Sequence, residues 1–270
     1  MPQKVFKENL FRYWRIWILC LRASIRKSRA YKEEILVRFL RTIFIVLTQL
    51  LLLYVVFGNQ EYFVGWSRSE AYLVLGIWNL LNYVGWALFG VNLSMLERRV
   101  VDGDFDFILT KPISSAWLTS FGDFSMYNLI SALSGIILIV YYFVVNWTSV
   151  SLSNVLLLVC AIAVAAIIWY AIYLFFASFT LSIPRNGFMG IAKELLGLTR
   201  YPTNIYTSTL QFVFYTLIPI AFVSTVPVEI LTNRVSFVLL IIGAGIALIL
   251  LRFSCWVWNK NIRKFVSAGG

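Results

Sequence analysis

The chain has 270 residues, of which 60% are hydrophobic and only 13% are charged. A soluble domain of this length needs far more polar surface, so the composition excludes one. The chain contains no histidine, which rules out an imidazole proton relay and a histidine metal site. Several stretches reach the roughly 20 apolar residues that cross a bilayer as a helix, and none alternates like a barrel strand. We therefore expect an all-α polytopic membrane protein.

Residues 1–34 predict a cytoplasmic amphipathic helix that lies at the membrane interface. Arg12, Arg15 and Arg22 interrupt its apolar residues, so it is not a transmembrane span. Its tryptophans, such as Trp14, suit the headgroup depth. The helix is either a simple anchor or an elbow that fixes the first span and touches a cytosolic partner, and the sequence favours neither.

The apolar segments that follow predict six transmembrane helices, which form one domain over residues 35–256. Their approximate bounds are 35–57, 70–95, 120–145, 152–178, 208–226 and 235–256. A cytoplasmic tail, residues 257–270, ends the chain.

The distribution of Lys and Arg predicts the orientation of these spans. The loops after the first, third and fifth spans contain only two of the 23 cationic residues, Arg68 and Arg234. Cytoplasmic loops carry the excess of Lys and Arg. We therefore expect a multi-pass protein of a bacterial cell membrane, with both termini and the loops 96–118 and 179–207 in the cytoplasm. Anionic membrane lipid, rather than nucleic acid, then accounts for the net charge of +11.

The second cytoplasmic loop is itself expected to contain an amphipathic helix. Phe188, Ile191 and Leu195 share one face of residues 187–200. Proline residues bracket this segment on both sides, as they do at helix boundaries.

Several kinds of chemistry find no support in the sequence. No glycine-rich loop ends in Gly-Lys-Ser/Thr, so we expect no ATP binding by this chain and no other cofactor in it. Asp123, near a cytoplasmic end, is the one acid or base that we place inside a span. Ion-coupled transporters carry ionisable groups there, and a hydrolase needs a nucleophile with its base. We expect neither a self-powered pump nor an enzyme.

Neutral polar and aromatic side chains recur within the spans. Interhelical hydrogen bonds of about 1 kcal/mol each explain such residues, and a weakly polar wall of a transport pathway is the functional alternative. The candidates for that wall are Trp78, Asn79, Asn82, Trp86, Gln211 and Tyr215.

The loop after the second span carries an acidic stretch, "ERRVVDGDFDFILTKPIS" at residues 97–114. Gly103 suits a tight turn, Phe105, Ile108 and Leu109 share one side of a short helix, and Pro112 ends it. Exposed apolar side chains cost free energy unless a partner or the membrane covers them. The stretch is either an ordinary solvated loop or a docking element for a basic-rimmed, apolar groove.

The run "VVDGDFDFILTKPIS" resembles an element of the membrane subunits of type-2 ABC exporters, the ABC-2 family of transporter proteins. The resemblance extends to "RYPTNIYTSTLQFVFYTLIPIAFVSTVPVEIL" at residues 200–231, where Tyr201-Pro202 leads into the fifth span. The stretch "FDFILTKP" departs from the family in Thr110-Lys111, where Leu-Arg is more usual, which leaves the choice of partner open.

The resemblance implies a permease that dimerises with an identical or related permease. Each permease would dock on a cytosolic nucleotide-binding ATPase, which binds ATP and Mg. The loop after the second span would be the coupling helix. Its residues would be Glu97, Arg98, Asp102, Gly103, Asp104, Phe105, Asp106, Ile108, Leu109, Lys111 and Pro112.

The resemblance also implies an external gate at the end of the fifth span. In the wider family a re-entrant hairpin forms such a gate, and Pro219, Pro227 and Glu229 are its candidates here. Pro219 is expected to kink the helix. A plain turn between the fifth and sixth spans is the alternative.

We therefore expect a permease subunit of an exporter. Its substrate is expected to be hydrophobic or amphipathic, because no fixed charge is seen along the path. An ATP-independent lipid scramblase and a membrane scaffold or immunity protein that recruits a cytosolic partner are the alternatives.

Overall fold

The structure is a computed structural model that describes residues 2–29, 32–184 and 187–266. Helices dominate these residues, and the strands described are a single two-residue pair. The first half of the chain contains α1 (Pro2–Arg29), α2 (Lys32–Phe57), β1 (Tyr62–Phe63), β2 (Trp66–Ser67), α3 (Arg68–Gly85), the π-helix η1 (Trp86–Gly90), α4 (Val91–Ser94), α5 (Leu96–Val101), α6 (Phe105–Leu109), α7 (Ser115–Phe121), α8 (Met126–Ser131) and α9 (Leu133–Val145). The second half contains η2 (Trp147–Ser149), α10 (Leu152–Ser178), η3 (Phe179–Leu181), α11 (Phe188–Gly197), η4 (Leu198–Arg200), η5 (Thr203–Ile205), α12 (Ser208–Thr216), α13 (Ala221–Leu231) and α14 (Val238–Ile262).

Five helical runs are long and apolar enough to cross a membrane, within the part of the chain that the structure describes. They are Phe39–Phe57, Arg68–Val101, Met126–Val145, Leu152–Leu181 and Val238–Ile262. They match five of the expected spans, so the prediction of a polytopic α-helical membrane protein is confirmed.

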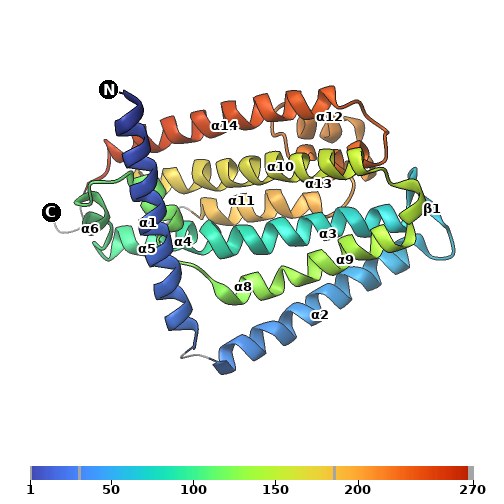
Figure 1. The fold of residues 1–270 in the computed structure, drawn as a ribbon, viewed down its shortest axis with the longest axis horizontal. Coiled ribbons are helices and arrows are strands. Elements are labelled where there is room, and N and C mark those ends of the chain that lie inside the picture. Colours follow the sequence, from blue (N-terminus) through green and yellow to red (C-terminus); the bar gives the residue numbers. More distant parts are fainter. Residues whose placement is uncertain (1, 30–31, 185–186, 267–270) are drawn as a thin grey trace.

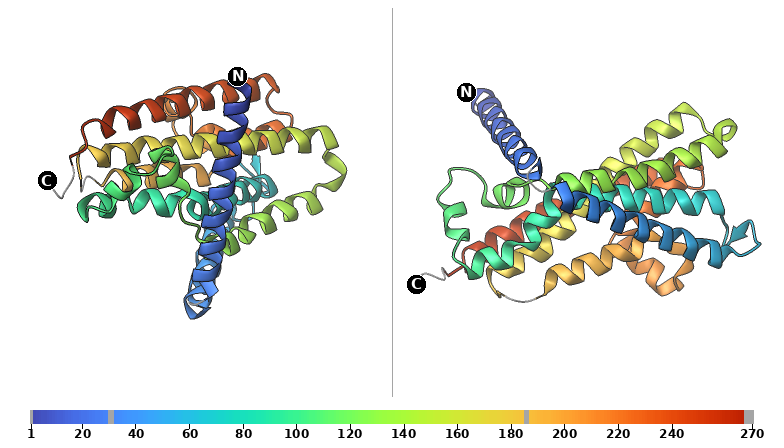
Figure 2. Two further views of the ribbon diagram at one scale, coloured as in Figure 1. Left: turned by 60° about the vertical axis from the view of Figure 1, so that its left-hand side comes forward. Right: turned by 90° about the horizontal axis from the view of Figure 1, so that it is seen from below.

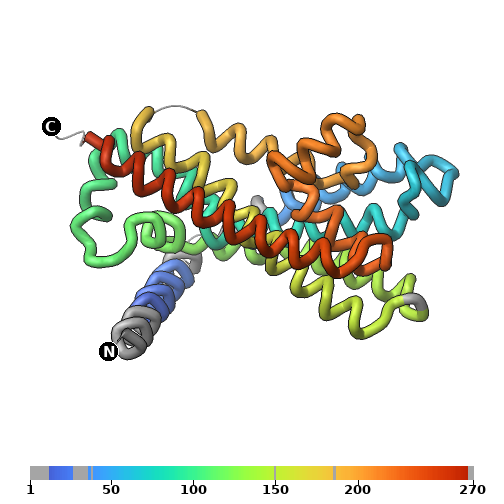
Figure 3. Tube along the Cα trace, turned by 90° about the horizontal axis from the view of Figure 1, so that it is seen from above, coloured from blue at the N-terminus to red at the C-terminus, as the bar shows by residue number. Residues whose placement is uncertain are grey.

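The expected fifth span, residues 208–226, is not one continuous helix. Two short helices, α12 and α13, replace it and meet at an angle of 96°. The break contains Pro219, which has no backbone N–H to donate to a helix. The pair lies in the half of the bundle near β1 and β2 (Figures 1 and 3).

The long helices run side by side along one axis, which gives the bundle two distinct ends (Figure 1). One end carries α5, α6 and the last turn of α14, and we call it the α6 end. The opposite end carries β1 and β2, and we call it the hairpin end. Helix α10 packs on α14, α13 and α11, while α3 packs on α9.

Helix α1 lies across the bundle rather than along it (Figures 1 and 2). The Ser114 backbone N–H donates to the Tyr13 hydroxyl at 3.1 Å, and the rings of Tyr13 and Trp117 lie 5.0 Å apart. Farther along, the Phe124 backbone N–H donates to Ser24 Oγ at 2.9 Å. These contacts fix α1 to α7 and to the segment before α8.

Part of the stretch expected to form the second cytoplasmic loop, residues 179–207, lies within the bundle. Helix α11 contacts α10 and runs beside it (Figure 1). The Trp78 indole N–H donates to the Leu196 carbonyl oxygen at 2.8 Å. Because Trp78 is ten residues into the span that begins at Arg68, this contact lies about 15 Å from the hairpin end. Segment 188–200 therefore adds side chains to the interior.

Candidate functional site

The loop after the second span folds as two short helices joined by a tight turn at the α6 end. Helix α5 ends at Val101, and α6 begins at Phe105. Gly103 in the turn has a φ of +81°, a left-handed conformation that favours glycine. The predicted turn at this residue is thus present, and we call residues 96–112 the α5–α6 protrusion.

The side chain of Phe105 does not lie on the surface of the protrusion. It is fully buried, with its ring 6.4 Å from that of Trp258 and 5.1 Å from that of Phe265. Ile108 is half-buried against the same core. The expectation of an exposed face made of Phe105, Ile108 and Leu109 is therefore wrong for Phe105, because the end of the chain covers it.

The exposed apolar side chains of the protrusion are Phe107 and Leu109. Phe107 is 70% exposed and Leu109 is 39% exposed. Phe107 was missed because it lies between the positions that the helical spacing grouped together. An exposed aromatic ring beside an exposed leucine forms an apolar surface that another protein could cover.

Charged side chains surround this apolar pair. Asp102, Asp104 and Lys111 are exposed, and Glu97 and Asp106 are half-buried. Other predicted coupling residues also lie on the protrusion: Arg98 Nε donates to Asp102 Oδ2 at 3.1 Å, and Pro112 is exposed. The structure thus gathers all the predicted coupling residues into one protrusion, although Phe105 faces inward.

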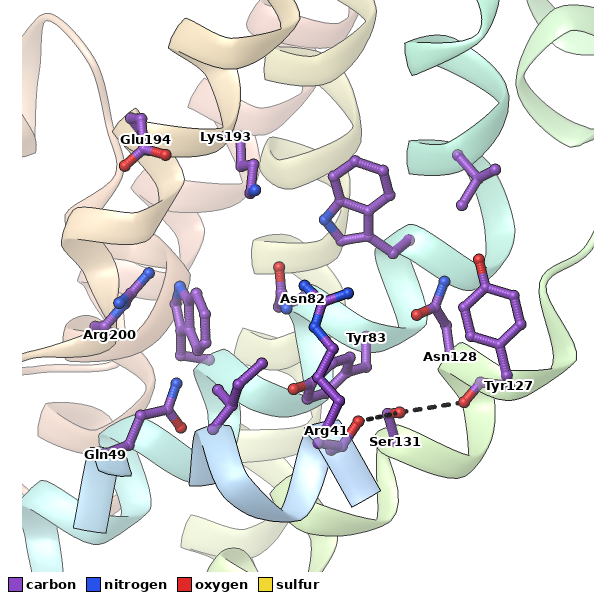
Figure 4. Close-up of a pocket in the computed structure, with 15 residues that line it drawn as sticks. Arg41, Gln49, Asn82, Tyr83, Tyr127, Asn128, Ser131, Lys193, Glu194 and Arg200 are labelled. Atoms are coloured by element: carbon purple, nitrogen blue, oxygen red, sulfur yellow. Dashed lines mark hydrogen bonds between the residues drawn. The ribbon is translucent and has the colours of Figure 1, made fainter. Parts of the chain in front are cut away.

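A cavity of about 340 Å³ opens between α2, α3, α8 and α11 (Figure 4). Three of the six candidates for a pathway wall, Trp78, Asn82 and Trp86, line this cavity. The remaining lining residues are Arg41, Thr42, Ile45, Gln49, Tyr83, Val91, Tyr127, Asn128, Ser131, Lys193, Glu194 and Arg200.

The other three candidates for the pathway wall lie elsewhere. Asn79 is buried behind the cavity, where its side-chain amide donates to Gln49 Oε1 at 3.2 Å. Gln211 donates to the Tyr206 carbonyl oxygen at 2.8 Å, and the Tyr215 hydroxyl donates to Glu229 Oε2 at 3.2 Å. The bonds of Asn79 and Tyr215 each join two helices, as the interpretation by interhelical hydrogen bonds expects, whereas the bond of Gln211 is local.

Four charged residues on the cavity wall were missed. Arg41 comes from α2, Lys193 and Glu194 come from α11, and Arg200 comes from η4. From the sequence, no fixed charge was seen along a transport path, and these four residues were not considered as pathway candidates. The signal was present in the sequence, but three of these residues lay in a stretch interpreted as a loop.

Arg200 is the most enclosed of these cations. Its guanidinium carbon lies 4.7 Å from the centre of the Trp78 ring, a cation–π geometry. Its Nε atom is buried and has no hydrogen-bond partner among the residues that the structure describes.

Helix α2 closes the cavity and is tied to its neighbours by side-chain hydrogen bonds. Thr42 Oγ1 and Ser131 Oγ lie 2.8 Å apart, which links α2 to α8 (Figure 4). The Gln49–Asn79 bond links α2 to α3 two turns farther on. Side-chain hydrogen bonds thus connect α2 to both α8 and α3 at the cavity wall.

The π-helix η1 places Trp86 on the cavity wall. Such one-turn widenings of a helix occur often at functional sites. The Ser125 backbone N–H donates to the carbonyl oxygen of Ala87 at 3.0 Å. The Asn92 side-chain amide donates to the Ser120 and Asp123 carbonyl oxygens at 2.8 and 2.7 Å. The break before α8 therefore fits against the widened turn.

The residues expected at an external gate are buried. Every residue of α13 is buried, including Pro227 and Glu229, and Pro219 lies in the break before α13. These residues are buried within the protein, and their part in an external gate stays a prediction. Within the bent helix pair α12–α13, the Tyr215 hydroxyl donates to the Glu229 carboxylate at 3.2 Å.

An ion pair that the sequence analysis did not single out lies at the hairpin end. Arg234 Nη2 donates to Glu70 Oε1 and Oε2 at 2.7 and 2.6 Å. The Arg234 guanidinium also lies 4.6 Å from the centre of the Trp66 ring. This pair links the start of α3 to the segment between α13 and α14, beside a wide hollow of about 900 Å³.

Comparison with known proteins gives one match. A family model described as ABC-2 family transporter protein matches residues 43–269. No curated protein and no solved structure matches the chain.

Proposed function

Since the chain belongs to the ABC-2 family of transporter proteins, we propose that it is the membrane permease subunit of an exporter. A separate cytosolic ATPase, which binds ATP and Mg, would drive transport. Two permease subunits, identical or related, would pair to form the pathway. The substrate would be hydrophobic or amphipathic.

The exposed α5–α6 protrusion supports docking of an ATPase. Phe107 and Leu109 offer an apolar contact, and the exposed Asp102 and Asp104 flank it. Carboxylates and an apolar pair suit a hydrophobic groove with a basic rim, since complementary charge guides association and selects the partner. This surface is the observation that carries the proposal.

The inward-facing side of the protrusion supports a coupling role. Phe105 packs between Trp258 and Phe265, and the Trp258 indole N–H donates to Ser115 Oγ at 3.1 Å. A displacement of α6 by a docked ATPase would therefore push on α14 and α7 together. Docking and force transmission then belong to opposite sides of one short helix.

In this proposal the α6 end and both termini would face the cytoplasm of a bacterial cell. The hairpin end, with the ion pair of Glu70 and Arg234, would face outward. The bent pair α12–α13 would then lie in the outer half, where Pro219, Pro227 and Glu229 would contribute to an external gate.

The test is a gentle affinity purification from native membranes, with an assay of ATP hydrolysis. We expect a stoichiometric ATPase with a P-loop to co-purify, and Phe107→Asp to remove it. Phe237→Asp is the matched control, because Phe237 is also exposed but lies just before α14 at the hairpin end.

A preparation without any ATPase, or an ATPase that binds the Phe107→Asp variant as well as the wild type, would overturn the proposal. Lipid scrambling in vesicles would then become the measurement to make. Phe105→Asp is unsuitable for this test, because a carboxylate at a buried position disturbs folding as well.

A further inference from the structure

We propose that the cavity of Figure 4 and an apolar cleft beside it form one binding site for an anionic amphipath. Its phosphate-like or carboxylate headgroup would lie near Arg41, Lys193 and Arg200. Its apolar tail would occupy the cleft. The inference rests on the proposed function, because it names the class of substrate that the permease would carry.

The charge of the cavity favours an anion. Three cationic side chains, Arg41, Lys193 and Arg200, line it against the single carboxylate of Glu194. Arg41 and Lys193 are exposed and Arg200 is half-buried, and an enclosed cation such as Arg200 is costly unless it pairs with another group. A bound anion would compensate the excess positive charge, whereas a cation would add to it.

Arg200 is positioned to bind such a headgroup. Its guanidinium stacks on Trp78 at 4.7 Å, which limits its orientation. Its buried Nε lacks a hydrogen-bond partner among the described residues. A guanidinium offers planar paired donors that match the oxygens of carboxylate and phosphate.

The cleft that would hold the tail lies beside the cavity, one turn farther along α2. It has a volume of about 120 Å³ and is lined mainly by apolar side chains, among them Leu53, Val56, Phe57 and Ala71. Tyr201, Pro202 and Ile205 close it from the other side. Polar groups are scarce on these walls, so the cleft suits hydrocarbon.

The two hollows have no lining residue in common, but they lie next to each other along the chain. On α2 the cavity residue Gln49 is one turn from the cleft residue Leu53. Arg200 lines the cavity, and its neighbour Tyr201 lines the cleft. The charged head of one molecule would therefore contact the polar cavity while its apolar tail occupies the cleft. The tail would point toward the hairpin end.

The test measures binding to the purified full chain in nanodiscs of zwitterionic lipid, with radiolabelled dodecyl phosphate as the probe. Unlabelled dodecyltrimethylammonium and inorganic phosphate serve as competitors. We expect dodecyl phosphate to bind saturably, and both competitors to displace it poorly. Because no ATPase is needed, a failure here is distinct from a failure of ATPase docking.

Charge variants test the headgroup site. Arg200→Gln and Lys193→Gln should each weaken binding about tenfold, the loss expected for one charged hydrogen bond. Glu194→Gln should strengthen binding, because it removes a repelling carboxylate. Arg252→Gln, an exposed position on α14, should have no effect.

A bulky substitution tests the tail site. Val56→Phe should reduce binding several-fold, because Val56 lines the mouth of the cleft. Val55→Phe is the matched control, since Val55 is an exposed neighbour outside the cleft.

Three results would overturn the inference. The first is equal affinity for dodecyl phosphate and dodecyltrimethylammonium. The second is unchanged binding in both the Arg200→Gln and Lys193→Gln variants. The third is inorganic phosphate that competes as well as dodecyl phosphate, which would leave the cleft without a role. Lys193 is exposed, so its variant remains informative even if Arg200→Gln fails to fold.

Discussion

Loss of the ion pair between Glu70 and Arg234 should destabilise the hairpin end of the bundle measurably. The side chain of Glu70 is 12% exposed and that of Arg234 is 32% exposed, so the pair is intermediate between surface and interior. Exposed pairs contribute up to about 1 kcal/mol, and removal of one partner of a buried pair costs about 3–5 kcal/mol. We expect about 2 kcal/mol for Glu70→Gln.

The choice of glutamine isolates the charge. Glu70 Oε2 also accepts a hydrogen bond from the Ser67 backbone N–H at 2.7 Å, as part of a capping box at the start of α3. Glutamine keeps an oxygen for this bond. The cost measured should therefore come from the lost attraction to Arg234 and not from the helix cap.

A double-mutant cycle measures this attraction. For a chain of this size, about 2 kcal/mol corresponds to a fall in Tm of about 4–8 °C, which thermal unfolding of the purified protein in detergent would detect. Arg234→Gln should cause a similar fall, and the double variant should be little worse than either single one. Glu61→Gln, an exposed carboxylate at the same end, is the control. Falls in Tm that simply add in the double variant would refute the pair as a stabilising contact.

Two further changes test the packing by thermal unfolding. Phe105→Ala should cost about 3–5 kcal/mol, as for other buried aromatics, whereas Phe107→Ala should change stability by less than about 0.5 kcal/mol; equal effects would contradict the opposite orientations of these rings. Gly135→Ala should lower Tm, because its Cβ would lie 2.5 Å from the Leu80 backbone nitrogen, while Gly190→Ala, with no atom within 4 Å, should not lower it. A Gly135→Ala variant as stable as the wild type would show that α3 and α9 pack less closely.

The spans that the sequence predicted well are those whose hydropathy is uninterrupted. Phe39–Phe57 and Leu152–Leu181 agree with their predicted ranges within four residues, because length and apolar composition alone define such a helix. The fifth span was harder to predict. A proline can kink a continuous helix or end one. Only the structure shows that the helix breaks here into α12 and α13, which meet at 96°.

The orientation of a short helix is equally hard to predict from spacing. Phe105 and Phe107 lie two residues apart, on different sides of α6, and either could have been the buried one. Their environment decides, because Trp258 and Phe265 reach α6 from the far end of the chain. No local pattern contains that long-range contact, so the sequence predicted the protrusion but not which of its faces is free.

The charged wall of the cavity was missed for a related reason. Lys193, Glu194 and Arg200 lower the hydropathy of residues 187–200, so the sequence analysis placed this segment as an amphipathic helix in a cytoplasmic loop. In the bundle, α11 turns an apolar side toward α10 and α3, where Ala192 and Leu196 are buried, and leaves its charged side on the cavity. A helix that packs on one face and borders a polar cavity on the other needs only half the apolar residues of a lipid-facing span. Charge in such a segment therefore does not exclude it from packing inside the helix bundle.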